Sequence, residues 1–109
     1  MVWEVKFFQT KRGKYPVKDF LDKLNPPTLA KAIRSIELLE NHGPFLRPPF
    51  AKKLTSQLHE LRIHGKQAIR IFYTTINNKY YLLHAFQKKS QKTPRKEIKL
   101  ALDRVNDLI

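Results

Sequence analysis

The sequence predicts an α+β domain in which a small antiparallel sheet is packed by an N-terminal helical hairpin and a C-terminal helix, in the order β-α-α-β-β-β-α. Residues 58–89 alternate apolar and polar side chains with a period of two, as strands do. Residues 16–41 and 94–108 instead repeat apolar side chains every three or four positions, as amphipathic helices do. With 109 residues, 41% of them hydrophobic, we expect a single domain over residues 1–109.

Short local patterns define the N-terminal elements. Residues 3–7 alternate apolar and charged side chains, which predicts a short strand with one buried face. Pro16 can open a first helix, and Asn25 can cap a second helix that ends at Gly43. Residues 45–57 show no periodicity, so we expect a loop that leads into the strand region.

The first two of the three later strands place like charges opposite each other. The turn at residues 64–67 sets Ile63 against Ile69, and this register puts Arg62 opposite Arg70. Such a pair costs up to about 1 kcal/mol. In one interpretation the two arginines are opposed because together they bind an anion. In the alternative interpretation both guanidinium groups lie in solvent and Glu60 neutralises one of them.

A two-residue turn at residues 77–78 then determines the register of the third strand, because asparagine tolerates positive φ. It pairs Phe72 with Leu83, and strict alternation then sends His84 to the apolar face of Ile71, where a histidine is usually a core group. This alternation divides the strand between the two faces: Tyr81, Leu83, Ala85 and Gln87 lie with the arginines, and Tyr80, Leu82, His84 and Phe86 lie with the apolar residues.

The positive charge is concentrated in one part of the chain. The formal net charge is +13, and residues 47–99 hold thirteen Lys or Arg against two Asp or Glu, whereas residues 1–46 hold eight against five. A field of one sign attracts polyanions, so RNA, DNA or an acidic protein are the expected partners. A solvated basic face without a partner is the alternative.

Several classes of site are excluded or disfavoured by composition. The absence of cysteine excludes disulfides, thiol catalysis and thiolate metal sites. The four histidines have no carboxylates at ligand spacing beside them, so we expect no metal and no cofactor. No apolar run of membrane length and no secretory signal pattern occurs, so we expect no membrane association and a cytoplasmic location.

Three motifs in the strand region resemble a known family. They are LHELRI at residues 58–63, IRIFY at residues 69–73 and LLHAFQKKSQKTP at residues 82–94. Together with the order of elements, they resemble the RelE/HigB superfamily of type II toxin–antitoxin toxins, in its phage-derived, HigB-like branch. The resemblance implies a RelE-like fold for the whole chain.

The resemblance also implies an activity. Toxins of this type act as ribosome-dependent mRNA endonucleases that inhibit translation, and the 2′-hydroxyl of the message attacks the adjacent phosphate without a metal. The implied partners are an acidic cognate antitoxin, the ribosome and mRNA. Two alternatives stay open: a ParE-like toxin that poisons gyrase, and a non-catalytic relative that only binds nucleic acid.

The resemblance assigns roles to individual cations. The implied catalytic residues are Arg70, Lys89, Lys53 and Arg62, with Arg70 stabilising the charge of the transition state. The implied RNA-binding residues are Lys52, Lys88, Lys92, Arg95 and Lys96. Some relatives carry a tyrosine or histidine near the chain's end, but the last 20 residues here contain neither. A lysine, Gln87 or His84 therefore remains for proton transfer.

Overall fold

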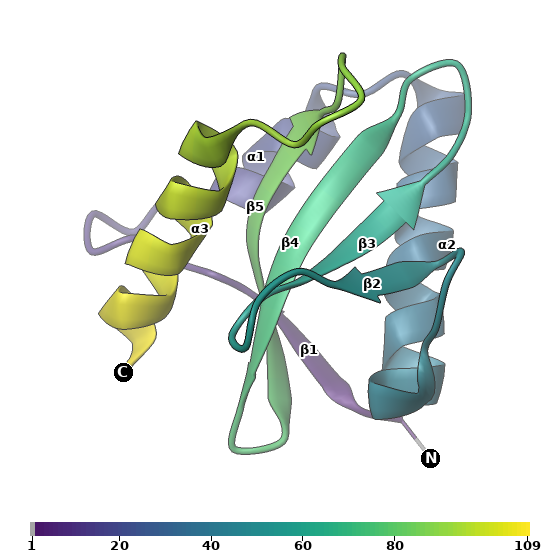
Figure 1. Cartoon of the computed structure of the whole chain (residues 1–109). Coiled ribbons are helices and arrows are strands. Elements are labelled where there is room, and N and C mark those ends of the chain that lie inside the picture. The colour runs from purple at the N-terminus through teal and green to yellow at the C-terminus, as the bar shows by residue number, and fades with distance from the viewer. Residues whose placement is uncertain (1) are drawn as a thin grey trace.

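The computed structural model describes residues 2–109 and confirms the α+β class, with a five-stranded sheet between helices (Figure 1). The elements in chain order are β1 (Glu4–Phe7), α1 (Pro16–Asp22), α2 (Pro26–His42), a 3-10 helix (Gly43–Phe45), β2 (Ala51–Lys53), β3 (His59–Ile63), β4 (Ile69–Ile76), β5 (Lys79–Gln87) and α3 (Arg95–Leu108). The predicted cap of α2 is confirmed, because the Thr28 N–H donates to the Asn25 side chain at 3.0 Å.

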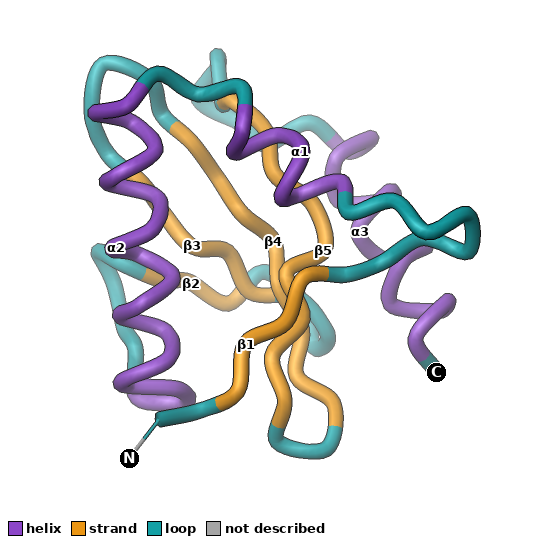
Figure 2. The backbone as a smooth tube through the Cα atoms, turned by 180° about the vertical axis from the view of Figure 1, so that it is seen from behind, coloured by secondary structure: helices purple, strands orange, loops and turns teal. Residues whose placement is uncertain are grey.

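The sheet is mixed rather than wholly antiparallel. Its strand order is β1-β5-β4-β3-β2, and β1 pairs with β5 in parallel while the other neighbours are antiparallel. The α1–α2 hairpin carries the chain from one edge of the sheet to the other, and the meander from β2 to β5 then returns it to β1 (Figure 2). A helical crossover of this kind is what permits parallel pairing.

The predicted loop over residues 45–57 is wrong at three positions. Ala51–Lys53 form the edge strand β2, which pairs with the residues from Leu61 back to His59. Three residues are too few to show a period of two, so no pattern in the sequence marks this strand. The correction matters because two of the three residues are lysines assigned to the site.

Each face of the sheet has its own apolar core. Helices α1 and α2 cover one face (Figure 2), and α3 covers part of the other (Figure 1). The core under α1 and α2 includes Val17, Leu21, Ala32, Leu39, Leu61, Ile63, Ile69, Ile71, Tyr73, Tyr80, Leu82 and Ala85. The core under α3 includes Phe8, Leu58, Phe72, Leu83, Phe86, Ala101 and Val105.

The strand register is confirmed as far as a β-bulge in β5. Arg62 pairs with Arg70 as predicted, and Asn77 and Asn78 both adopt positive φ, of 52° and 65°. A register shift between Phe72 and Tyr73 then pairs Phe72 with His84 instead of Leu83.

The bulge reverses the alternation that was predicted for the rest of β5, because one extra residue exchanges the two faces. His84 therefore shares a face with Phe72, on the side of α3, and its predicted place beside Ile71 is wrong. Phe86 likewise lies opposite Arg70 on the arginine side, and Ala85 and Gln87 move to the other face, opposite Ile71 and Ile69.

Replacement of Gly43 by alanine should destabilise the fold strongly. Gly43 has φ +52°, and an added Cβ would lie 2.4 Å from the Trp3 ring. The backbone N–H of Trp3 donates to the Glu40 carbonyl at 2.7 Å, which ties Trp3 to α2. We expect Gly43→Ala to lower the free energy of unfolding by about 2–5 kcal/mol, from backbone strain plus overpacking. Urea denaturation measures the loss.

Gly13→Ala is the matched control for this prediction. Gly13 also has positive φ, +85°, but the nearest atom to an added Cβ is the Gln9 side chain at 3.7 Å. We therefore expect Gly13→Ala to lower the free energy of unfolding only by the backbone strain, about 1–2 kcal/mol. Equal losses for the two variants would show that the contact with Trp3 contributes nothing.

Candidate nucleic-acid interface

The two opposed arginines lie on the side of the sheet that carries α3, which we call the arginine face and define by Glu60, Arg62 and Arg70. Arg62 Nε donates to Glu60 Oε1 at 3.0 Å, so Glu60 neutralises Arg62 as one of the alternatives supposed. Glu60 is only 2% exposed and Arg70 only 7%. The supposition that both guanidinium groups lie in solvent is therefore wrong, because Arg70 is buried.

The guanidinium of Arg70 is only partly satisfied by the protein. Its Nη1 donates to the carbonyl oxygen of Ile69 at 3.1 Å, while the buried Nε has no hydrogen-bond partner. Burial lowers the pKa of Arg70 from its ordinary value; the charge of Glu60 opposes this effect and that of Arg62 adds to it. A buried cation with an unpartnered N–H group is stabilised by an anion that accepts from it.

A hollow of about 380 Å³ lies beside Arg70, where β4 begins and β5 ends. The two strand ends lie side by side at the top of Figure 1, and the Lys88 N–H donates to the Ala68 carbonyl at 2.7 Å to hold them together. The hollow is lined by Ala68, Arg70, Lys88, Lys89, Ser90 and Gln91. Three cations predicted for the site are thus brought together around a space larger than a phosphate group.

Lys52 and Lys53 lie on opposite faces of the sheet. Lys52 pairs with Glu60 and so lies on the arginine face, whereas Lys53 pairs with His59 on the face of α2. Burial, and secondarily the positive charge of Lys53, lower the pKa of His59. Of this basic pair, the structure brings only Lys52 together with the arginines.

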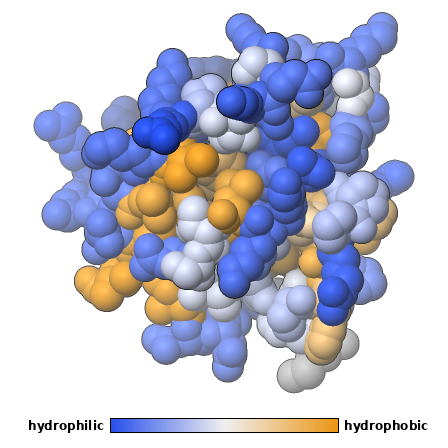
Figure 3. Space-filling view, viewed as in Figure 1, coloured by the Kyte–Doolittle hydropathy of each residue, from blue (hydrophilic) through white to orange (hydrophobic). Residues whose placement is uncertain are grey.

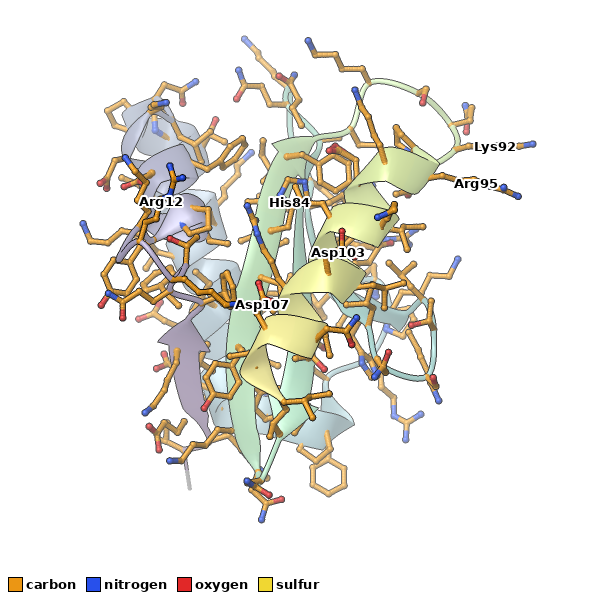
Figure 4. All side chains as sticks on the ribbon, turned by 90° about the vertical axis from the view of Figure 1, so that its left-hand side faces the viewer. Arg12, His84, Lys92, Arg95, Asp103 and Asp107 are labelled. Atoms are coloured by element: carbon orange, nitrogen blue, oxygen red, sulfur yellow. The ribbon has the colours of Figure 1, made fainter. Side chains whose placement is uncertain are left out.

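Three further predicted cations extend the positive surface beyond the hollow. Lys92 lies in the β5–α3 connection, and Arg95 and Lys96 begin α3; all three are exposed. Lys92 and Arg95 point away from the sheet (Figure 4). Hydrophilic side chains cover the upper part of the arginine face, while apolar side chains gather around α3 (Figure 3). These three residues can contact a long polyanion but do not line the hollow.

His84 belongs to a polar cluster between β5 and α3. Its Nε2 lies 3.1 Å from Glu97 Oε1, and Arg104 Nη1 lies 3.5 Å from its Nδ1 while donating to the Leu83 carbonyl at 2.8 Å. Burial lowers the pKa of His84; the hydrogen bond to Glu97 and the charge of that residue oppose the shift, and Arg104 adds to it. The cluster joins α3 to the sheet.

Neither His84 nor Gln87, two of the candidates for proton transfer, lines the hollow. Gln87 lies opposite Ile69 on the other face of the sheet. Sequence analysis in turn missed Ser90 and Gln91, which line the hollow and whose only signal was their position directly after Lys88-Lys89. It also missed Arg104, which no strand or helix pattern relates to His84.

A comparison with known protein families identifies the family of this chain. Residues 19–106 match the family described as "Phage derived protein Gp49-like (DUF891)". The chain belongs to this family. The Gp49-like proteins are a toxin-like family of the RelE/HigB type, and the matched range includes every cation discussed above. A comparison with curated proteins gives no match.

The described part of this Gp49-like chain lacks two other kinds of feature. Residues 2–109 contain no group of three or more His, Cys, Asp or Glu side chains placed to hold a metal ion. None of the helices in that range is long and apolar enough to cross a membrane.

Acidification should destabilise the protein through His84. Because its folded pKa lies below the ordinary value of 6.5, the unfolded chain binds more protons between the two values. The free energy of unfolding should therefore be highest above pH 6.5 and fall as the pH decreases through 6.5. Urea denaturation between pH 7.5 and 5.5 measures this, and His84→Gln should flatten the dependence.

His59→Gln provides the comparison, because burial also lowers the pKa of His59. We expect each variant to remove part of the pH dependence and the double variant to remove more than either. A dependence unchanged by His84→Gln would contradict the proposed burial effect at this residue.

Proposed function

We propose that this protein is the toxin of a type II toxin–antitoxin pair and that it cleaves mRNA in the decoding site of the ribosome. The observation that carries the proposal is the hollow at the start of β4, where the buried Arg70 meets Lys88 and Lys89. Membership of the Gp49-like family supports a toxin-like role. The excess positive charge of residues 47–99 supports a polyanionic substrate.

The proposed reaction needs charge stabilisation more than it needs a nucleophile from the protein. The 2′-hydroxyl of the message attacks the adjacent phosphorus, the bond from phosphorus to the 5′-oxygen breaks, and a 2′,3′-cyclic phosphate and a 5′-hydroxyl end form. Negative charge develops on the phosphoryl oxygens in the transition state, where preorganised cations are most effective. Arg70 lines the hollow together with Lys88 and Lys89, so all three cations can lie beside these oxygens.

One proton passes from the 2′-hydroxyl to water in the open hollow, and one must reach the departing 5′-oxygen. Among the candidates of the sequence, only lysines line the hollow, since His84 is engaged with Glu97 and Gln87 lies on the opposite face. We assign Lys88 or Lys89 as the donor to the 5′-oxygen, because an ammonium group carries transferable protons and lies beside the phosphate position.

The proposed partners follow from the same charge distribution. The ribosome presents the message to the arginine face, where Lys52, Lys92, Arg95 and Lys96 contact flanking phosphates. An acidic antitoxin neutralises this face by charge complementarity. The proposal therefore includes one protein partner and one ribonucleoprotein substrate.

Expression of the chain in bacteria, followed by primer extension on cellular messages, tests the proposal. We expect growth arrest with cleavage inside translated regions, and no cleavage of the same messages when purified protein is added without ribosomes. DNA damage signalling with intact messages would overturn the proposal in favour of gyrase poisoning. RNA binding without any cleavage would instead show a non-catalytic relative.

Loss of the cations of the hollow should abolish cleavage. We expect Arg70→Ala to reduce the cleavage rate by about 10²–10³-fold, as for the loss of a preorganised donor at a transition-state charge, and the addition of Lys89→Ala to reduce it further. Lys18→Ala is the control, because Lys18 is exposed on α1 and pairs with Asp22 at 3.4 Å. Full toxicity of a folded Arg70→Ala, Lys89→Ala variant would contradict the assignment.

The two adjacent lysines of β2 provide an internal comparison. Lys52→Ala and Lys53→Ala remove the same charge, but only Lys52 lies on the arginine face. We expect Lys52→Ala to weaken binding of a single-stranded RNA oligonucleotide and to reduce the slope of log affinity against log salt by about one. Lys53→Ala should change that slope less. Fluorescence anisotropy over a series of salt concentrations measures both, and the reverse order would contradict the placement.

A further inference from the structure

We propose that Glu60 is a positioning residue, which keeps Arg62 and Arg70 ordered side by side so that Arg70 can receive a phosphate. This inference deepens the proposed function and rests on it for its effect on cleavage. It concerns an acidic residue that the sequence analysis considered only as a group that neutralises one of the two arginines. The structure instead buries Glu60 among cations.

Three positively charged residues neighbour Glu60 on one face of the sheet, and one of them is bonded to its carboxylate. Arg62 is two residues away on β3 and donates to Oε1 at 3.0 Å. Lys52 lies directly opposite on β2. Arg70, directly opposite Arg62 on β4, is the diagonal neighbour and its pKa responds to the charge of Glu60. Glu60 is thus the one acidic residue within the four-residue group.

Two buried atoms in this group have no hydrogen-bond partner. They are Glu60 Oε2 and Arg70 Nε. The carboxylate holds Arg62 by one oxygen and leaves the other free, so it attracts Arg70 without engaging its Nε–H group. Arg70 is therefore held in place by the neighbouring negative charge while its side chain still lines the hollow.

The carboxylate also explains how the like-charge pair is tolerated. Two guanidinium groups opposed across a ladder repel each other. By bonding Arg62 Nε, Glu60 turns that guanidinium along its own strand and offsets the repulsion with a buried negative charge. A carboxylate that is 2% exposed does not contact solvent or a bound message, so its role is to act through the arginines.

Glu60→Gln tests the inference, because the amide can still accept from Arg62 but carries no charge. Glu4→Gln is the matched control: Glu4 also pairs with a cation two residues along a strand, Lys6 at 3.1 Å, but both are exposed on β1. Both variants gain the same net charge. We expect Glu60→Gln to reduce kcat of ribosome-dependent cleavage by about 10- to 100-fold without raising KM, and Glu4→Gln to change neither.

An independent measurement follows the arginines themselves. In ¹⁵N-labelled protein, hydrogen exchange of the Arg62 and Arg70 Nε–H groups should be slow in the wild type and in Glu4→Gln, and faster in Glu60→Gln. If Glu60→Gln does not fold, Glu60→Asp retains the charge but withdraws the carboxylate by one methylene, and should show a smaller increase in exchange.

The two sets of results separate the inference from the proposed function. Unchanged exchange in the folded Glu60 variant, or an equal loss of kcat in Glu4→Gln, would overturn the positioning role. Absence of cleavage by the wild-type protein would overturn the proposed function instead. In that case the exchange of Arg62 and Arg70 still decides whether Glu60 orders them.

Discussion

The opposition of Arg62 and Arg70 across β3 and β4 is the constraint around which the rest of the site is arranged. The protein cannot relieve it by sliding one strand past the other, because a slip of one residue would turn the apolar core side chains of the strand that moves outward. The register that buries Leu61, Ile63 and Ile71 thus forces the two cations together. The negative charge of the buried Glu60, which bonds Arg62, offsets their repulsion.

The two helical layers make this arrangement asymmetric. Helices α1 and α2 cover one face of the sheet, while α3 covers only part of the other. The bulge in β5 places His84 under α3, where its contacts with Glu97 and Arg104 help to hold the helix. Arg70 lies at the start of β4, beside the end of β5. The chain that follows β5 places Lys88 and Lys89 around the same hollow as Arg70.

The sequence predicted the elements whose signals are local and periodic. The α+β class, the capped α2, the Asn77-Asn78 turn and the Arg62–Arg70 register all follow from spacing and turn chemistry, and all are confirmed. The grouping of Arg70 with Lys88 and Lys89 followed from the resemblance and the ends of adjacent strands. These features depend on residues close in sequence or on a single hairpin.

What could not be predicted depends on contacts between distant segments. No residue type at Leu83 or His84 marks the β5 bulge. Strand β2 is too short to show an alternating pattern. The parallel pairing of β1 depends on where the helical hairpin returns the chain. The burial of Glu60 is of the same kind, since a glutamate in an alternating strand is expected in solvent.

Both edges of the sheet have a consequence for solubility. The outermost strands, β1 and β2, are only four and three residues long, and they carry the charged side chains of Glu4, Lys6, Lys52 and Lys53. Short edges with charges on them offer a poor template for the strand of another copy. The mostly buried central strands are in this way flanked by edges that oppose growth into an intermolecular sheet.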